Sequence, residues 1–169
     1  MKYVDRKLLG LFSLFKGLTD QELDLVSRII TAKDVSPGTV IISEGEIGDE
    51  MYLLVEGTVD IHKTLTVVTS KQEFGTKERT FMRLTGENHL FFGELALFGG
   101  RERSATVQAA NKCNLLVIKA DDFLKLCENE PRIGYVIITN IALNLATNLR
   151  KTNEDVIKLT TALSLALQG

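Results

Sequence analysis

Short β-branched runs separated by glycines fill the middle of the chain. The runs lie at residues 40–42, 51–55, 59–61, 105–109 and 114–118, and the glycines between the first three are Gly45, Gly48 and Gly57. Short extended segments joined by glycine turns predict an antiparallel sheet, because tight turns connect antiparallel neighbours. Helical patterns stand at both ends of the chain, so the fold class predicted is α+β with a closed or rolled sheet.

The first helical pattern precedes the strands. Apolar residues recur from Leu8 to Leu18, and Thr19-Asp20-Gln21-Glu22 then has the capping-box form that starts a helix. We predict that this helix runs from Asp20 to about Ala32, before the turn at Ser36-Pro37-Gly38.

Two further segments are assigned from their local pattern. Residues 69–80 are polar and resemble a long hairpin loop. Asp121 or Asp122 can cap a short helix that ends near Glu128, because aspartate is a favoured helix N-cap.

One long helix is predicted from Pro131 to the C-terminus, because proline suits the first helical position and no Pro or Gly follows Gly134 until Gly169. We divide the chain into a sheet domain, 1–130, and this helix, 131–169.

The length and spacing of this helix predict a dimer. A helix of roughly 35 residues is about 50 Å long, longer than a domain of this size is wide, so part of it needs another partner. Its heptad spacing predicts that this partner is a second copy in a parallel homodimer. The alternative is packing on its own sheet domain. The seam residues are Ile138, Ala142, Leu145, Leu149, Thr152, Val156, Leu159, Leu163 and Ala166.

Residues 92–107 form a candidate phosphate cradle, with the sequence Phe-Gly-Glu-Leu-Ala-Leu-Phe-Gly-Gly-Arg-Glu-Arg-Ser-Ala-Thr-Val. Binding a cyclic phosphate without a metal requires backbone N–H groups at close range and a guanidinium fork. Arg103 supplies that fork, and the Ser104 hydroxyl can donate to the same phosphate. Glu94 can accept from a ribose 2′-hydroxyl. Close backbone approach is permitted by Gly93, Gly99 and Gly100.

This segment resembles the phosphate-binding cassette of the cyclic nucleotide-binding domain family, which includes catabolite-activator regulators, kinase regulatory subunits and gated channels. Residues 44–57 also resemble the glycine-turned β-roll of that family, so the likeness covers roughly residues 12 to 160. The resemblance implies a jelly-roll barrel that binds cAMP or, alternatively, cGMP. One departure is that residues 86–91 insert extra positions before Phe92.

The resemblance also implies a role for each cassette position. It assigns Glu94 and the Gly93 amide to the ribose, Arg103 and Ser104 to the cyclic phosphate, and Val107 to the base or sugar wall. The remaining cassette positions in the predicted ligand site are Phe92, Leu95, Ala96 and Ala105.

Residues 144–156 resemble the dimerisation helix of catabolite-activator proteins, where adjacent polar residues reach the adenine amino group. Thr152 and Asn153 occupy those positions here. A polar residue at a heptad seam also sets helix register, and this second interpretation stays open.

Composition excludes several other functions. A net charge of −2 and a pI of about 5.8 lack the basic surface that nonspecific nucleic-acid binding needs. Two cysteines and two histidines are too few for an iron–sulfur cluster, a metal cluster or a catalytic triad, and Ser104 has no adjacent base. We therefore expect no enzyme, no metal and no haem. No signal peptide or membrane span is recognised, so a cytoplasmic location is expected.

The sequence ends at Gly169, so we expect no winged helix-turn-helix domain and no direct DNA binding. The apolar tail 159–167 can dock on a dimer mate, on a protein effector or on the sheet domain. The resulting hypothesis is a dimeric cyclic-nucleotide sensor, preferring cAMP. The alternatives are an interaction scaffold with a vestigial pocket and a truncated transcription regulator that acts through a partner.

Overall fold

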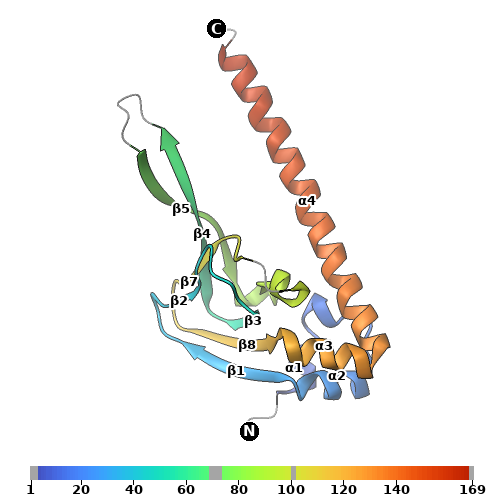
Figure 1. Ribbon diagram of the computed structural model, residues 1–169. Helices are drawn as coiled ribbons and strands as arrows, with labels where there is room; N and C mark the ends of the chain where they lie inside the picture. Colours follow the sequence, from blue (N-terminus) through green and yellow to red (C-terminus); the bar gives the residue numbers. More distant parts are fainter. Residues whose placement is uncertain (1–3, 69–73, 100–101, 168–169) are drawn as a thin grey trace.

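Two four-stranded antiparallel sheets face each other in the computed structural model, which describes residues 4–68, 74–99 and 102–167 (Figure 1). One sheet has the order β1-β8-β3-β6, formed by β1 (Ile30–Val35), β8 (Cys113–Lys119), β3 (Glu50–Glu56) and β6 (Phe91–Phe92). The other has the order β2-β7-β4-β5, formed by β2 (Val40–Ile42), β7 (Thr106–Ala109), β4 (Thr58–Val68) and β5 (Phe74–Thr85). The predicted α+β fold with a rolled antiparallel sheet is confirmed.

Helices gather beside the first sheet, and one of them is far longer than the rest (Figure 1). The α-helices are α1 (Arg6–Leu9), α2 (Asp20–Ser27), α3 (Ala120–Asn129) and α4 (Pro131–Leu167). The 3-10 helices are η1 (Ser13–Phe15), η2 (Gly86–Asn88) and η3 (Glu94–Phe98). No helix in the described ranges is long and apolar enough to cross a membrane.

Strand β3 is buried on both faces, and this divides the hydrophobic core in two. Successive side chains of a strand point to opposite faces. Tyr52 and Leu54 therefore point into the roll, whereas Met51 and Leu53 point toward the helices, and all four are buried. The inner cluster, between the sheets, also contains Val35, Ile42, Val59, Phe92, Val107, Ala109, Cys113, Leu115 and Val117.

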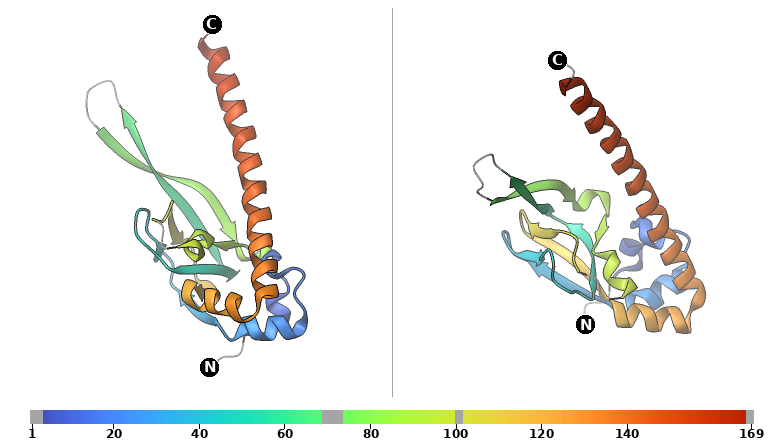
Figure 2. Two further views of the ribbon diagram at one scale, coloured as in Figure 1. Left: turned by 45° about the vertical axis from the view of Figure 1, so that its right-hand side comes forward. Right: turned by 45° about the horizontal axis from the view of Figure 1, so that its top comes forward.

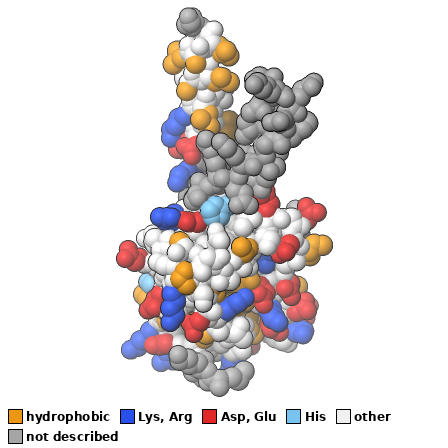
Figure 3. Space-filling view, turned by 90° about the vertical axis from the view of Figure 1, so that its left-hand side faces the viewer, with side chains coloured by type: hydrophobic (Ala, Val, Ile, Leu, Met, Phe, Trp, Pro, Cys, Tyr) orange, Lys and Arg blue, Asp and Glu red, His pale blue; other side chains and the backbone are white. Residues whose placement is uncertain are grey.

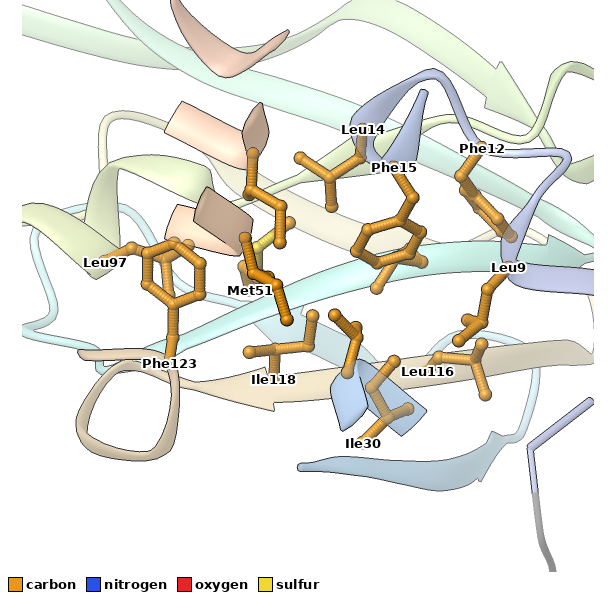
Figure 4. Close-up of a cluster of buried hydrophobic side chains, with 14 of the residues drawn as sticks. Leu9, Phe12, Leu14, Phe15, Ile30, Met51, Leu97, Leu116, Ile118 and Phe123 are labelled. Carbon is orange, nitrogen blue, oxygen red and sulfur yellow. The ribbon is translucent and has the colours of Figure 1, made fainter. Parts of the chain in front are cut away.

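The outer cluster lies between the first sheet and the helices. Figure 4 shows Leu97 of η3 beside Phe123 of α3, with Met51 and Ile118 of the sheet close by. Leu9, Leu14 and the rest of the N-terminal apolar stripe complete it at the other end, and Ile133, Ile137 and Ile141 enter it from α4. The outer cluster thus joins the cassette segment to the C-terminal helix.

Helix α4 begins at Pro131, as predicted, and only its first part packs on the domain. Asn140 Nδ2 donates to Leu14 O and to Lys16 O, both at 2.9 Å, which fixes the helix on the N-terminal segment. Every described residue from Ala146 onward is exposed. Figure 2 shows this second half projecting away from the sheets.

The predicted extent of the second helix is wrong at its C-terminal end. Helix α2 ends at Ser27, and residues from Ile30 form β1. This strand pairs with β8 along its whole length, from Ile30↔Ile118 to Val35↔Cys113. Pairing with the apolar strand β8 therefore outweighs the local helical pattern.

The predicted hairpin loop at residues 69–80 is too long. Strand β5 begins at Phe74 and pairs with β4 from Val68↔Phe74 to Thr58↔Thr85. A two-stranded ribbon pairs the backbone groups of its inner edges in the ladder and leaves those of its outer edges to water, so strand pairing does not need the apolar alternation that a half-buried strand shows. Residues 69–73 lie outside the described residues.

Two other local predictions are corrected or resolved. The N-cap of α3 is Lys119 and not Asp121 or Asp122, so the helix begins earlier than predicted, where the Ala120 amide donates to Asp49 O at 2.7 Å. The extra residues before Phe92 form η2 and a left-handed residue, His89, with φ 47°. Strand β6 then pairs Phe92 with Tyr52, which fixes the strand register entering the cassette.

Glu22 connects the start of α2 to the start of α4. Its carboxylate accepts from Arg132 Nη1 and, as the third residue of the capping box, from the Thr19 amide at 2.8 Å. These hydrogen bonds, first that of Arg132, lower the pKa of Glu22 to about 2 from a usual value of 4.5. The charged form is therefore the one that stabilises the fold.

Glu22→Gln should lower the free energy of unfolding by about 1 kcal/mol at neutral pH, the usual magnitude for a lost cap. A lowered pKa gives stabilisation that is complete above 4.5 and is lost as pH falls toward 2. Denaturant unfolding at pH 7 and at pH 2 to 3 measures this difference. Asp20→Asn, in the same helical turn, is the matched control. A Glu22→Gln deficit that stays unchanged at pH 2 contradicts the assignment.

Candidate functional site

Arg103 lies on a segment that is paired with the loop before β3. The Arg103 amide donates to Glu46 O at 2.8 Å, and the Gly45 amide donates to Arg103 O at 2.9 Å. An isolated bridge between Ile47 and Glu102 continues this pairing. These main-chain contacts fix the backbone at residue 103 independently of the contacts that its side chain makes.

The Arg103 guanidinium forms a fork onto two main-chain oxygens. Nη2 donates to Glu50 O at 2.8 Å, and Nη1 donates to Gly93 O at 3.3 Å. A side chain at residue 48 is incompatible with this position, because a Cβ on Gly48 would overlap the guanidinium. Gly48 is therefore a component of the site as well as a turn residue.

Gly93 shapes the cassette at its start. Its φ of 76° lies in the left-handed region, and its carbonyl also accepts from the Ala96 amide at 3.2 Å at the beginning of η3. A Cβ at residue 93 would lie 3.0 Å from Arg103 Nη1. Gly99 ends η3 with a φ of 101°, whereas Gly100 lies outside the described residues.

The apolar cassette residues have different environments. Phe92 is buried in the inner cluster, with its ring stacked on Tyr52 at 5.3 Å between centroids and 19° between planes. Ala96 is buried and Leu95 is exposed. The cassette therefore presents Leu95 to solvent while Phe92 fixes its first residue in the roll.

Glu94 is half-buried at the first position of η3. Burial raises the pKa of its carboxyl above the usual value of 4.5, opposed by a hydrogen bond from its own backbone N–H. A carboxylate near a helix N-terminus that is withdrawn from water is ready to accept a hydrogen bond from a ligand hydroxyl.

The residues after Arg103 lead into β7. Ser104 is exposed, Ala105 is half-buried and Val107 is buried in the inner cluster. Between them, Thr106 Oγ1 accepts from the Glu44 amide at 3.1 Å, which adds a second connection to the loop before β3. The structure thus brings Phe92 to Ala96 and Arg103 to Val107 together at one end of the roll.

Thr152 and Asn153 are not brought to this end within one chain. Both are exposed on the projecting half of α4, and Thr152 Oγ1 donates to Asn148 O at 2.9 Å within the helix. Their contact with a nucleotide base stays a prediction that needs a second copy of the chain.

Three contributors were not assigned to the site from sequence. Gly48 is predicted only as a turn residue, Tyr52 only as part of the strand run 51–55, and Glu50 only as part of the β-roll resemblance at residues 44–57. The sequence signal for these residues is a glycine, Gly48, two positions before a polar strand residue. The contact between Arg103 and Gly48, however, joins segments that are far apart in the sequence. A local sequence pattern therefore does not predict this contact.

A surface pocket of about 580 Å³ lies elsewhere, where the turn after β3 meets η2. Glu56, Thr85, His89 and Asn111 are among its lining residues, and none belongs to the cassette. The His89 ring packs against the Phe12 ring, with 5.3 Å between centroids, and its buried Nδ1 has no hydrogen-bond partner among the described groups.

A metal site is not found among the described residues, because no three of their His, Cys, Asp or Glu side chains lie close enough together to hold an ion.

The model of the cyclic nucleotide-binding domain matches residues 32–130, a range that includes the whole cassette and every strand residue of both sheets except Ile30 and Thr31. This chain belongs to the cyclic nucleotide-binding domain family. The family match agrees with the cassette resemblance.

Relatives in this family include potassium channels and a cyclic AMP receptor protein. The chain is 34% identical over 130 residues to a cyclic nucleotide-gated potassium channel of Mesorhizobium japonicum, covering 77% of the chain and 32% of the channel. It is 31% identical over 140 residues to the cyclic AMP receptor protein of Thermus thermophilus, covering 83% of the chain and 58% of the receptor. The chain thus spans less than two thirds of either protein.

A solved structure supports the same fold. The crystal structure of the Thermus thermophilus catabolite activator protein is similar with a TM-score of 0.72 and 29% sequence identity. The similarity covers 88% of this chain and 63% of that one.

Replacing Glu94 should stabilise the ligand-free protein. An acid whose pKa is raised in the fold stabilises it below the unfolded pKa, and this contribution is lost as pH rises through the folded pKa. Glu94→Gln should therefore raise the Tm by a few degrees at pH 7 and leave it unchanged below pH 4.5, because the neutral amide avoids burying a charge. Thermal unfolding at both pH values measures this.

Glu102→Gln, on an exposed residue of the same segment, controls for the lost negative charge. A lower Tm for Glu94→Gln at pH 7 would contradict the prediction. It would show that the charged carboxylate stabilises the ligand-free fold and is not left to accept a hydrogen bond from a ligand.

Proposed function

We propose that this chain is a cyclic-nucleotide sensor that binds cAMP at the Arg103 end of the roll. The observation that carries the proposal is the Arg103 fork. Its described hydrogen bonds to Gly93 O and Glu50 O use one N–H of each terminal nitrogen. A guanidinium has five N–H groups, so N–H groups beyond these two are left to donate to the acceptor oxygens of a ligand.

The chemistry of a cyclic phosphate fits this fork. Such a ligand has one negative charge shared by two exocyclic oxygens, which matches a single planar cation. The exposed Ser104 hydroxyl adjoins Arg103 and supplies a further donor. Glu94 is the acceptor proposed for the ribose 2′-hydroxyl, because its carboxylate is half-buried on the other arm of the cassette.

The preference for cAMP rests on two supports. The Thermus thermophilus relative is named a cyclic AMP receptor protein. The residues at the base-contacting positions of the resemblance are Thr152 and Asn153, which offer a hydroxyl and an amide. The alternative ligand is cGMP.

A parallel homodimer through α4 is part of the proposal. Side chains of the predicted seam on its projecting half are exposed in the single chain: Leu149 by 61%, Val156 by 53%, Leu159 by 70% and Leu163 by 60%. Figure 3 shows hydrophobic side chains spread over this projecting part. Apolar surface of this extent on a soluble helix favours burial against a second copy.

Coupling between ligand and dimer follows from the outer cluster. Leu97 of η3 packs in the same cluster as Phe123 of α3 and Ile137 of α4. A shift of the cassette on binding therefore changes the packing under α4, which requires that the two states differ in ligand contacts. The downstream partner is a protein effector or a second regulator.

Calorimetry with cAMP and cGMP tests the ligand. Wild type should bind cAMP more tightly than cGMP, and Arg103→Ala should weaken cAMP binding about 100-fold, the loss of two charge-assisted hydrogen bonds. Arg103→Lys should fall between them, since it keeps the charge without the fork. Arg83→Ala is the matched control, because Arg83 pairs with Asp60 at 2.6 Å outside the cassette.

Unchanged cAMP affinity in Arg103→Ala refutes the site. Absence of binding to wild type at millimolar nucleotide refutes the sensor and leaves the scaffold with a vestigial pocket.

Sedimentation equilibrium tests the dimer. Leu163→Glu, at a seam position, should give a monomer at concentrations where wild type is dimeric, because a charge would be buried in the interface. Leu165→Glu is matched in chemistry and in exposure, 66% against 60%, but lies off the seam and should stay dimeric. Equal effects of the two substitutions contradict the predicted seam.

A further inference from the structure

Glu50 contacts the cassette through its main chain, and its side chain contacts Tyr52 of the same strand. Its carbonyl oxygen accepts from Arg103 Nη2 at 2.8 Å. Its carboxylate oxygen Oε2 accepts from the Tyr52 hydroxyl at 2.7 Å, two residues along the same face of β3. A carboxylate of this chain therefore stands on the residue that already contacts the guanidinium of the proposed phosphate site.

A carboxylate without another donor would compete for Arg103. Charge-assisted hydrogen bonds are roughly twice as strong as neutral ones, so a guanidinium prefers a carboxylate to a main-chain carbonyl. A Glu50 carboxylate paired with Arg103 would occupy the N–H groups proposed for the cyclic phosphate. Its negative charge would also repel that phosphate.

Tyr52 is fixed where it binds this carboxylate. It is 4% exposed, and its ring is stacked on Phe92. The Lys33 ammonium lies 5.7 Å from the ring centroid. Burial first, and then the hydrogen bond to Glu50, raise the pKa of Tyr52 above its usual value, so the hydroxyl keeps its proton. The donor is thus present at neutral pH.

We propose that the Tyr52 hydroxyl is a positioning group that holds the Glu50 carboxylate away from Arg103 and so keeps the guanidinium available to the ligand phosphate. The proposal rests on the proposed function for its effect on affinity. Its geometric part, the position of the Glu50 carboxylate, is independent of any ligand.

A crystal structure of ligand-free Tyr52→Phe tests the geometric part. Phenylalanine keeps the ring stacked on Phe92 and removes only the hydroxyl. The Glu50 carboxylate should then lie within hydrogen-bond distance of the Arg103 guanidinium. A carboxylate that keeps its wild-type position, or turns to solvent, overturns the proposal whether or not the protein binds a nucleotide.

A double-mutant cycle in cAMP affinity tests the functional part. Tyr52→Phe should weaken binding about 10-fold in the wild-type background. In the Glu50→Gln background the same substitution should change affinity by no more than about 2-fold, because the competing charge is gone. An equal loss in both backgrounds overturns the proposal, because the hydroxyl then acts without Glu50.

Adenosine, which has no phosphate, separates positioning from a general packing defect. Tyr52→Phe should lose affinity for cAMP and keep its affinity for adenosine. Equal losses for both ligands assign Tyr52 a structural role only. If Tyr52→Phe does not fold, the double variant is the test, because it removes the unpaired charge together with the hydroxyl. It must bind cAMP within about 2-fold of Glu50→Gln.

Discussion

The guanidinium of Arg103, held by the main-chain oxygens of Gly93 and Glu50, is the interaction on which the candidate site depends. Arg103 precedes β7 of one sheet, whereas Glu50 begins β3 and Gly93 follows β6 of the other. The fork therefore fixes the two sheets relative to each other at the end of the roll. It can lie there only because residue 48 has no side chain.

The same segment also belongs to both hydrophobic clusters, and this gives the site its connection to α4. Phe92 packs inside the roll, and Leu97, five residues later, packs outside it against Phe123. Gly93 lies between them at the start of η3 and has a left-handed backbone. In the proposed function, a ligand bound by Arg103 and Glu94 therefore acts on a short helix that contacts α3, which in turn contacts α4.

Sequence predicted those features that a local pattern determines. The capping box at Thr19, the start of α4 at Pro131 and the cassette glycines all follow from preferences of a few adjacent residues. Features fixed by distant pairing were missed. Residues 30–35 became a strand because β8 pairs with them, and Tyr52 and Glu50 entered the site because β3 lies beside Arg103. Thr152 and Asn153 depend on a second chain, so neither local pattern nor one chain tests them.

The central claim is that Arg103 receives the phosphate of a cyclic nucleotide and Glu94 its ribose. A crystal structure of the wild-type protein with cAMP tests it most directly. We expect exocyclic phosphate oxygens within hydrogen-bond distance of the Arg103 terminal nitrogens and the ribose 2′-hydroxyl on the Glu94 carboxylate. A nucleotide bound elsewhere, for example in the pocket beside His89, with Arg103 still engaged only by Gly93 and Glu50, would contradict the account.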